Sequence, residues 1–182
     1  RGIGKGICQT LRDKGYTVVA NYGGNDKAAQ DFTEETGLPA YKWDVGDHLA
    51  TIAGCARVAE EVGPIDVLVN NAGITRDGTL HKMTFEDWND VMRINLGGCF
   101  NMAKATFPGM RERGWGRIVN IGSVNGQAVQ YGQVNYAAAK SGIVSIGLDG
   151  ASIRIRSASA GGAPVWSYST ALTPRGRRCS RS

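Results

Sequence analysis

The chain has 182 residues, of which 42% are apolar and 20% charged, a balance typical of a globular domain that buries its own core. No apolar run approaches the roughly 18 residues of a membrane-spanning helix, so we expect no membrane association. The net charge of +5 arises in residues 151–182, where six arginines meet no acid, while the rest of the chain carries 15 basic and 16 acidic side chains, so the basic balance does not indicate a nucleic-acid partner.

The positions of the cysteines and the first residues of the chain indicate the cellular compartment of the protein. Cys8, Cys55, Cys99 and Cys179 are scattered, and no Cys-x-x-Cys pair or Cys/His cluster accompanies them. We therefore expect reduced thiols, no metal site and a cytoplasmic location. The chain opens at Arg1 without a signal peptide and without Met, so we expect it to begin inside a longer protein.

Helical and extended patterns alternate along the first 145 residues. The predicted strands are at 16–20, 38–43, 65–69 and 118–121. The predicted helices are one ending at 14–15, one at 26–36, one at about 47–62 and one that carries Tyr136 and Lys140. A further long helix, between the last two strands, starts at a Thr84-x-x-Asp87 capping box and kinks or ends at Pro108.

The predicted strands at 65–69 and 118–121 are apolar throughout, which is typical of a parallel sheet covered by helices on both faces. Right-handed crossovers then predict an α/β domain with a Rossmann-like doubly wound parallel sheet. Ligands of such sheets bind at the carboxyl ends of the strands. The polar and glycine residues expected at those ends are Asn21, Asp44, Asn70 to Gly73, and Gly122-Ser123.

Glycines near the start of the chain indicate one part of a nucleotide site. Gly2 and Gly4 precede a helix, where a phosphate group could approach the backbone, although a plain turn explains them equally well. Asn21 ends the next strand, where NAD-binding folds carry an acid for the ribose 2′-hydroxyl. A neutral side chain does not repel a 2′-phosphate, and Arg1 could pair with one, so we expect NADPH rather than NADH. The alternative is that Arg1 is merely exposed.

Two further strand ends and one helix carry polar residues that are candidates for the binding site. Asp44 could accept a hydrogen bond from an adenine amino group or cap the turn into the next helix. The run from Asn70 to Gly73 suits a turn packed against a flat ligand, or a turn alone. Asn95 lies among apolar residues of the long helix, where an unpaired asparagine is costly to bury.

Ser123, Tyr136 and Lys140 form the most specific pattern. Ser123 follows the strand at 118–121, Tyr136 comes 13 residues later, and Lys140 lies one helical turn beyond. An unperturbed tyrosine has a pKa of about 10, and a neighbouring ammonium group would lower that pKa. Tyr136 could then protonate a carbonyl oxygen that Ser123 holds, while Lys140 binds ribose hydroxyls.

From Arg1 to about Ser145, the chain resembles the short-chain dehydrogenase/reductase family in these motifs. The resemblance makes Ser123, Tyr136, Lys140 and Asn95 the catalytic residues, with Asn95 holding a water molecule in a proton relay from Lys140. Tyr136 and Lys140 would also contact the cofactor. The other cofactor contacts that it implies are Gly2, Ile3, Gly4, Asp44, Val45, Asn71, Ala72, Gly73, Ile74 and Thr75.

Within that family, the motifs N-A-G-I-T-R-D (71–77), R-G-W-G-R-I-V-N-I (113–121) and S-V-N-G-Q (123–127) resemble the bacterial acetoacetyl-CoA reductases of polyhydroxybutyrate synthesis. The resemblance implies reduction of a 3-oxoacyl-CoA. The alternatives are 3-oxoacyl-carrier-protein reduction and an inactive fragment of either reductase. The resemblance also implies that the full-length parent is a homotetramer formed partly through the Thr84 helix and the Tyr136 helix. The substrate residues that it implies are Asp77, Ser123, Gln130, Tyr131, Gly132 and Gln133.

The sequence departs from the family at both ends. The family's opening strand, at the centre of the sheet, and its first glycine precede Arg1. From residue 147 the chain becomes rich in Arg, Ser, Gly and Ala with no acid after Asp149, which predicts disorder or an altered reading frame. A basic nucleic-acid-binding arm is the alternative. We therefore expect a partial reductase domain at 1–146 and an atypical tail at 147–182.

Overall fold

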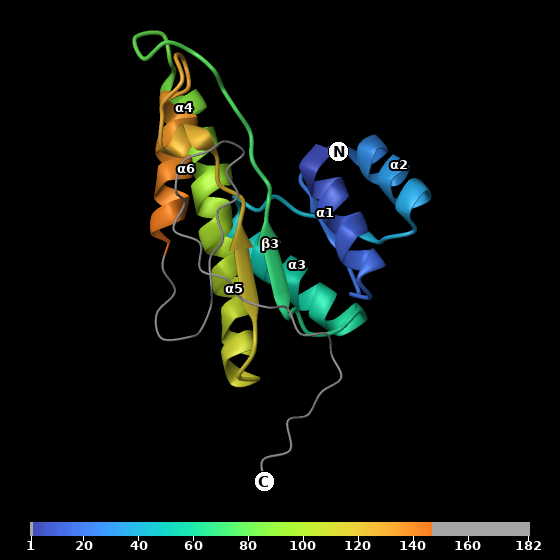
Figure 1. Ribbon diagram of the computed structural model, residues 1–182. Helices are drawn as coiled ribbons and strands as arrows, with labels where there is room; N and C mark the ends of the chain where they lie inside the picture. The colour runs from blue at the N-terminus through green and yellow to red at the C-terminus, as the bar shows by residue number, and fades with distance from the viewer. Residues whose placement is uncertain (1, 147–182) are drawn as a thin grey trace.

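The computed structural model describes residues 2–146. The predictions made for Arg1 and for the tail at 147–182 therefore lie outside the described residues. Within them, helices and strands alternate as the sequence predicts (Figure 1).

Six α-helices and two short helical segments of other kinds occur in the described residues. The α-helices are α1 (Gly2–Asp13), α2 (Asp26–Thr36), α3 (His48–Glu61), α4 (Phe85–Val91), α5 (Gly98–Glu112) and α6 (Val134–Ser145). The other two are the π-helical segment η1 (Met92–Gly97) and the 3-10 turn η2 (Val124–Gly126). The Thr84 capping box is confirmed, because the Thr84 hydroxyl accepts a hydrogen bond from Asp87 N–H and the Asp87 carboxylate accepts one from Thr84 N–H.

Four strands form two parallel pairs. β1 (Ala20–Tyr22) pairs with β2 (Ala40–Lys42), and β3 (Val67–Asn70) pairs with β4 (Arg117–Asn120). Each pair is joined by helical crossovers, which confirms the predicted α/β class with parallel strands. Among the described residues the two pairs are separate, in keeping with the expectation of a doubly wound sheet that is incomplete. In Figure 1, α1 and α2 lie to one side of β3, and α4, α5 and α6 lie to the other.

The predicted strand at 16–20 is wrong in position, because the observed strand begins only at Ala20. Ala20 N–H donates to Pro39 C=O at 2.9 Å, and the register starts at Ala20 and Ala40. Pro39 has no N–H to donate to an earlier residue of β1. The apolar residues before Ala20 therefore do not continue the hydrogen-bonded ladder with β2.

The predicted long helix continues past the point where we expected a kink or an end. Pro108 lies inside α5, which ends only at Glu112, just before Gly114. An irregularity that the sequence did not predict falls at η1, between α4 and α5. A π-helical turn shifts the backbone bonding by one residue and often occurs at functional sites, and this one contains Asn95.

The apolar core lies between β3, β4 and α5. It is built from Leu68, Ala103, Met110 and Ile118, with Ile65 and Met102 packed against it. Asn95 and Asn135 are also fully buried, and both belong to the site described below. Between residues 2 and 146, no helix combines the length and the apolar character needed to cross a bilayer.

Candidate active site

Helix α6 brings Tyr136 and Lys140 together as the sequence predicts. The Lys140 ammonium lies 5.7 Å from the centre of the Tyr136 ring. The Lys140 side chain is almost fully buried and donates a hydrogen bond to Ile121 C=O at 2.8 Å. Burial lowers the pKa of Lys140, and the nearby Cys99 thiol acts weakly in the opposite direction. The lysine is therefore fixed between the end of β4 and the tyrosine.

Ser123 follows β4 after Ile121 and Gly122 and caps the short turn η2. Its hydroxyl accepts a hydrogen bond from Asn125 N–H at 3.2 Å, which leaves the hydroxyl proton free to donate elsewhere. The turn packs closely on α6, since Ser141 donates from its hydroxyl to Gly126 C=O at 2.6 Å. A side chain at Gly126 would place its Cβ 2.9 Å from the Lys140 carbonyl carbon. A glycine is thus required for Ser123 to approach the helix that carries Tyr136.

We expect Gly126→Ala to destabilise the protein by about 1–3 kcal/mol, because the added methyl group meets backbone that cannot rotate away. The measurement is the free energy of unfolding in urea. Gly6→Ala is the matched control, since a Cβ at this helical position meets no atom within 4 Å and alanine favours helix. Equal stability of the two variants would contradict the close approach.

Asn95 connects η1 to the loop after β3. Its side-chain NH₂ donates to Ile74 C=O at 2.8 Å, and its side-chain oxygen accepts from Ile74 N–H at 3.0 Å. Gly73 lies against the same side-chain oxygen, and a Cβ there would also come within 3.9 Å of the Lys140 ammonium. Asn95, Gly73 and Lys140 therefore meet at one place, which the sequence alone left as an inference.

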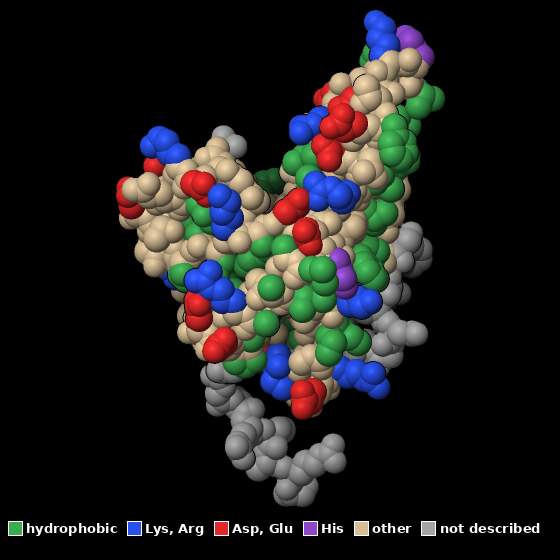
Figure 2. Space-filling model, turned by 180° about the vertical axis from the view of Figure 1, so that it is seen from behind, with side chains coloured by type: hydrophobic (Ala, Val, Ile, Leu, Met, Phe, Trp, Pro, Cys, Tyr) green, Lys and Arg blue, Asp and Glu red, His purple; other side chains and the backbone are tan. Residues whose placement is uncertain are grey.

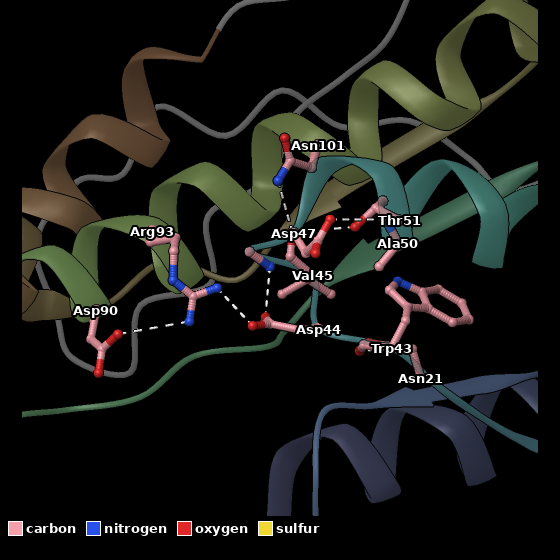
Figure 3. A network of polar contacts seen from close by, with 11 residues as sticks. Asn21, Trp43, Asp44, Val45, Asp47, Ala50, Thr51, Asp90, Arg93 and Asn101 are labelled. Carbon is pink, nitrogen blue, oxygen red and sulfur yellow. Dashed lines mark hydrogen bonds and ion pairs between the residues drawn. The ribbon is translucent and has the colours of Figure 1, made fainter.

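Asp44 lies at the centre of a polar network at the end of β2 (Figure 3). Its carboxylate accepts hydrogen bonds from Arg93 at 2.6 Å and from Gly46 N–H at 2.8 Å. It thus holds the turn, one of the two roles the sequence allowed. Burial acts to raise the pKa of Asp44, but the bonds from Arg93 and Gly46 outweigh it and hold that pKa below its ordinary value. Val45 is buried, and its C=O accepts from the Asn101 side chain at 2.9 Å.

We expect Arg93→Met to raise the pKa of the Asp44 carboxyl towards its ordinary value of about 3.9. Because a depressed folded-state pKa contributes stability that is lost as the pH falls through it, the stability difference between wild type and variant should shrink in acid. An NMR titration of Asp44 measures the shift directly. Arg57→Met is the control, since Arg57 pairs with Glu61 instead. An unchanged pKa for Asp44 in Arg93→Met would contradict the role of Arg93.

Most residues of the expected acyl site are joined by hydrogen bonds. The Gln133 side chain donates to Asp77 at 2.9 Å and accepts from the Asn125 side chain, which also reaches Gln130 at 3.4 Å. Gly78 N–H donates to Gly132 C=O at 2.8 Å, holding the two loops together. Tyr131 is the exception, since it is 90% exposed.

Three residues with positioning contacts were not singled out from the sequence. Arg93 holds Asp44, and Asn125 joins the serine turn to the expected acyl site. Asn135 is fully buried, donates to Arg76 C=O and Asp87 C=O, and accepts from Tyr136 N–H at 2.7 Å. A buriable polar residue directly before the tyrosine was the only signal for Asn135, and nothing in the sequence indicated its partners.

Some of the residues expected to bind the cofactor lie in contact with one another, and others do not. The Asn71 side chain packs against Gly4, where a Cβ would lie 2.8 Å from its nitrogen. A side chain in place of Gly4 or Gly73 would thus collide with the neighbouring asparagine. Asn21 donates to Trp43 C=O at 3.0 Å and, more weakly, to Tyr41 C=O, so its amide is already occupied. Gly2 and Ile3 begin α1 and are exposed.

The cavity that several of the expected cofactor residues line does not reach the tyrosine. It has a volume of about 1200 Å³ and opens between β1 and β3. Gly4, Asn21 and the turn from Asn70 to Ala72 line one part of it. Figure 2 shows the surface hollowed between the part that carries α1 and α2 and the part that carries α4.

A parallel α/β fold with a serine at a strand end and a Tyr-x-x-x-Lys helix defines a class of oxidoreductases. The sequence profile of the short chain dehydrogenases matches residues 1–151. The chain therefore belongs to the short-chain dehydrogenase family.

Its relatives carry more specific names. Acetoacetyl-CoA reductases from Rhizobium meliloti (strain 1021) and Paracoccus denitrificans are 58% and 59% identical over 142 residues, covering 78% of this chain. A 3-oxoacyl-acyl-carrier-protein reductase from Vibrio harveyi is 41% identical over 146 residues. The chain spans only 59% of the length of each of these relatives.

A solved structure supports the same fold. A gluconate 5-dehydrogenase from Burkholderia cenocepacia J2315, in complex with NADP and tartrate, superposes with a TM-score of 0.73 at 35% identity. The match covers 80% of this chain and 59% of the dehydrogenase.

Proposed function

We propose that the chain carries the catalytic centre of an NADPH-dependent reductase that converts a 3-oxoacyl-CoA, acetoacetyl-CoA, to the 3-hydroxyacyl-CoA for polyhydroxyalkanoate synthesis. The observation that carries the proposal is the meeting of Tyr136, a buried Lys140 and Asn95 beside the end of β4. The names of the more similar relatives support the acyl-CoA substrate over the carrier-protein substrate.

The residues have distinct proposed roles. Tyr136 donates a proton to the carbonyl oxygen of the substrate, and Ser123 holds that oxygen through its hydroxyl proton. The Lys140 ammonium favours the phenolate form of Tyr136 after proton transfer and binds ribose hydroxyls. Asn95 keeps a water molecule in the relay that returns a proton through Lys140. Bound NADPH supplies the hydride.

The preference for NADPH rests on the end of β1. Asn21 is neutral and its amide is already bonded. The next acid along the sequence, Asp26, accepts a hydrogen bond from Lys42 at 2.9 Å. In the described residues, no free carboxylate therefore stands where it would repel a 2′-phosphate. We propose that Arg1 pairs with that phosphate, and that Gly2 to Gly4 and Asn71 to Thr75 contact the rest of the cofactor.

The expected acyl-site residues supply the substrate side of the proposal. Asp77, Gln130 and Gln133 are held in one hydrogen-bonded set beside Ser123 through Asn125. We propose that this set, with Tyr131 and Gly132, contacts the acyl group.

We propose a cytoplasmic homotetramer whose contacts include α4, α5 and α6. Phe85 on α4 is 81% exposed and Phe100 on α5 is 53% exposed, and large exposed apolar side chains mark association surfaces. Figure 2 shows apolar side chains along this side of the molecule. Sedimentation of the chain tests the assembly, and a monomer at all concentrations would contradict it.

The activity is tested by following NADPH oxidation by the purified chain with acetoacetyl-CoA, with acetoacetyl-acyl-carrier protein, and with NADH in place of NADPH. We expect the combination of NADPH and acetoacetyl-CoA to be the fastest. A faster reaction with the carrier-protein substrate would favour the alternative reductase. Binding of NADPH without turnover of either substrate would indicate an inactive fragment.

A further inference from the structure

A buried asparagine stands directly before the proposed catalytic tyrosine. Asn135 is fully buried, and its side chain bonds through both the nitrogen and the oxygen. The nitrogen donates to Arg76 C=O at 2.9 Å and to Asp87 C=O at 3.3 Å, and the oxygen accepts from Tyr136 N–H at 2.7 Å. An amide nitrogen carries two hydrogens, so the two carbonyls do not compete for one donor.

The bond to Tyr136 takes the place of a helix cap. Gln133 precedes α6 without a side-chain cap bond, and Ala137 N–H is bonded to Gln133 C=O at 2.8 Å. The N–H groups of the first helical turn have no carbonyl within the helix to bond, and Tyr136 N–H is one of them. Asn135 supplies the acceptor, so it fixes the backbone of the tyrosine inside the fold.

The same side chain ties the start of α6 to the loop that follows β3. Three consecutive residues of that loop are bonded to the segment 132–135: Arg76 to Asn135, Asp77 to Gln133 and Gly78 to Gly132. The bond from Gln133 lies at the surface, whereas Asn135 is buried. A hydrogen bond away from water is electrostatically stronger than an exposed one. Asn135 is therefore the side chain of this set that water cannot replace.

A second buried asparagine holds the same loop from the other side. The side chain of Asn95 bonds to both Ile74 N–H and Ile74 C=O. The loop is thus held at two points, two positions apart in sequence, by residues of η1 and α6. The other donor bond of Asn135 reaches Asp87 in the first turn of α4, which leads into η1. The loop, α4 and α6 therefore meet at Asn135.

We propose that Asn135 is a positioning residue that sets the Tyr136 hydroxyl relative to the loop after β3, where the cofactor is expected to bind. This inference rests on the proposed function, because it concerns the proton that Tyr136 donates. Asn135 touches the backbone of Tyr136 and none of the reacting atoms, so it acts through the placement of the tyrosine. A misplacement of about 1 Å can cost about 10²-fold in rate.

The first variant is Asn135→Asp, which keeps the size of the side chain and the acceptor for Tyr136 N–H but removes both donor hydrogens at neutral pH. We expect kcat with acetoacetyl-CoA to fall at least about ten-fold. The Kd of NADPH, measured by fluorescence titration, should stay within about two-fold. The affinity is retained because Arg76 lies outside the expected cofactor contacts and Ile74 keeps its bonds to Asn95.

The matched control is Asn89→Asp. It makes the same isosteric change at an exposed position of α4, away from the contacts of Asn135. Both kcat and the Kd of NADPH should equal those of the wild type. The split between kcat and Kd in Asn135→Asp distinguishes positioning from a general structural role, which would lower both.

Amide hydrogen exchange tests the same arrangement without turnover. In Asn135→Asp, Gly78 N–H should exchange at least about ten-fold faster, because its loop is no longer tied to α6, while Tyr136 N–H stays protected. In Asn135→Ala, which also lacks the acceptor, both groups should exchange faster. Ile121 N–H, bonded to Asn70 C=O between the strands β3 and β4, reports unfolding of the whole domain and should not change.

Three results would overturn the proposal. A wild-type kcat in Asn135→Asp or unchanged exchange at Gly78 would show that the side chain does not set the tyrosine against the loop. An equal loss of kcat and NADPH affinity would make Asn135 a general support of the fold, as would faster exchange at Ile121. If the wild-type chain does not reduce acetoacetyl-CoA, the proposed function fails, and the exchange of Gly78 and Tyr136 still decides whether Asn135 joins the loop to the helix.

Discussion

Replacing Tyr136 with phenylalanine is expected to lower the rate of NADPH oxidation with acetoacetyl-CoA by about 10²- to 10⁴-fold, the usual contribution of a positioned general acid. The ring of Tyr136 remains beside the Lys140 ammonium in this variant, because phenylalanine keeps the aromatic face. Binding of NADPH should therefore change little. Steady-state kinetics and a fluorescence titration with NADPH separate the two effects.

The matched control for Tyr136→Phe is Tyr41→Phe. The Tyr41 hydroxyl donates to Glu61 at 2.9 Å on the surface and belongs to no part of the proposed site. This variant should retain the wild-type rate. Full activity of Tyr136→Phe would refute the proposed role of the tyrosine, and activity lost equally in both variants would point to a general effect on folding.

Replacing Asn95 with leucine is expected to destabilise the protein by about 2–5 kcal/mol and to abolish activity. Leucine is close to asparagine in size but leaves Ile74 N–H and Ile74 C=O without their partners, and each unsatisfied buried group costs about 1–3 kcal/mol. The loop that contains Gly73 would then lose its attachment to η1. Urea unfolding measures the loss of stability.

Asn89→Leu provides the control for this second variant. Asn89 belongs to α4 and is exposed, so its replacement should change the free energy of unfolding by less than about 0.5 kcal/mol. If Asn95→Leu were as stable as Asn89→Leu, the two hydrogen bonds to Ile74 would not hold the loop. Loss of activity without loss of stability would instead assign Asn95 to the reaction alone.

Local sequence rules predicted the elements that carry the site. The capping box at Thr84 and Asp87, the end of α2 before Gly37 and the placement of Tyr136 and Lys140 on one helix were all confirmed. Each depends on contacts within a few residues of the chain. Such contacts can be read directly from the order of residues.

Features that depend on distant residues were missed or misplaced. The start of β1 is decided by Pro39, 19 positions later in the chain, and the bonding of Asp44 by Arg93. Pro108 was expected to kink or end a helix that instead continues to Glu112. Pro39 and Arg93 are tertiary partners that a local pattern does not reveal.

The sequence by itself determined that Ser123, Tyr136 and Lys140 exist at spacings suited to carbonyl reduction, because strand ends and helical turns are set by local periodicity. Only the tertiary structure decided that Asn95 and Gly73 lie beside Lys140, and that Gly126 lets the serine turn approach α6. The physical reason is that packing and hydrogen bonding join residues far apart in the chain, and a one-dimensional pattern carries no record of which buried groups meet.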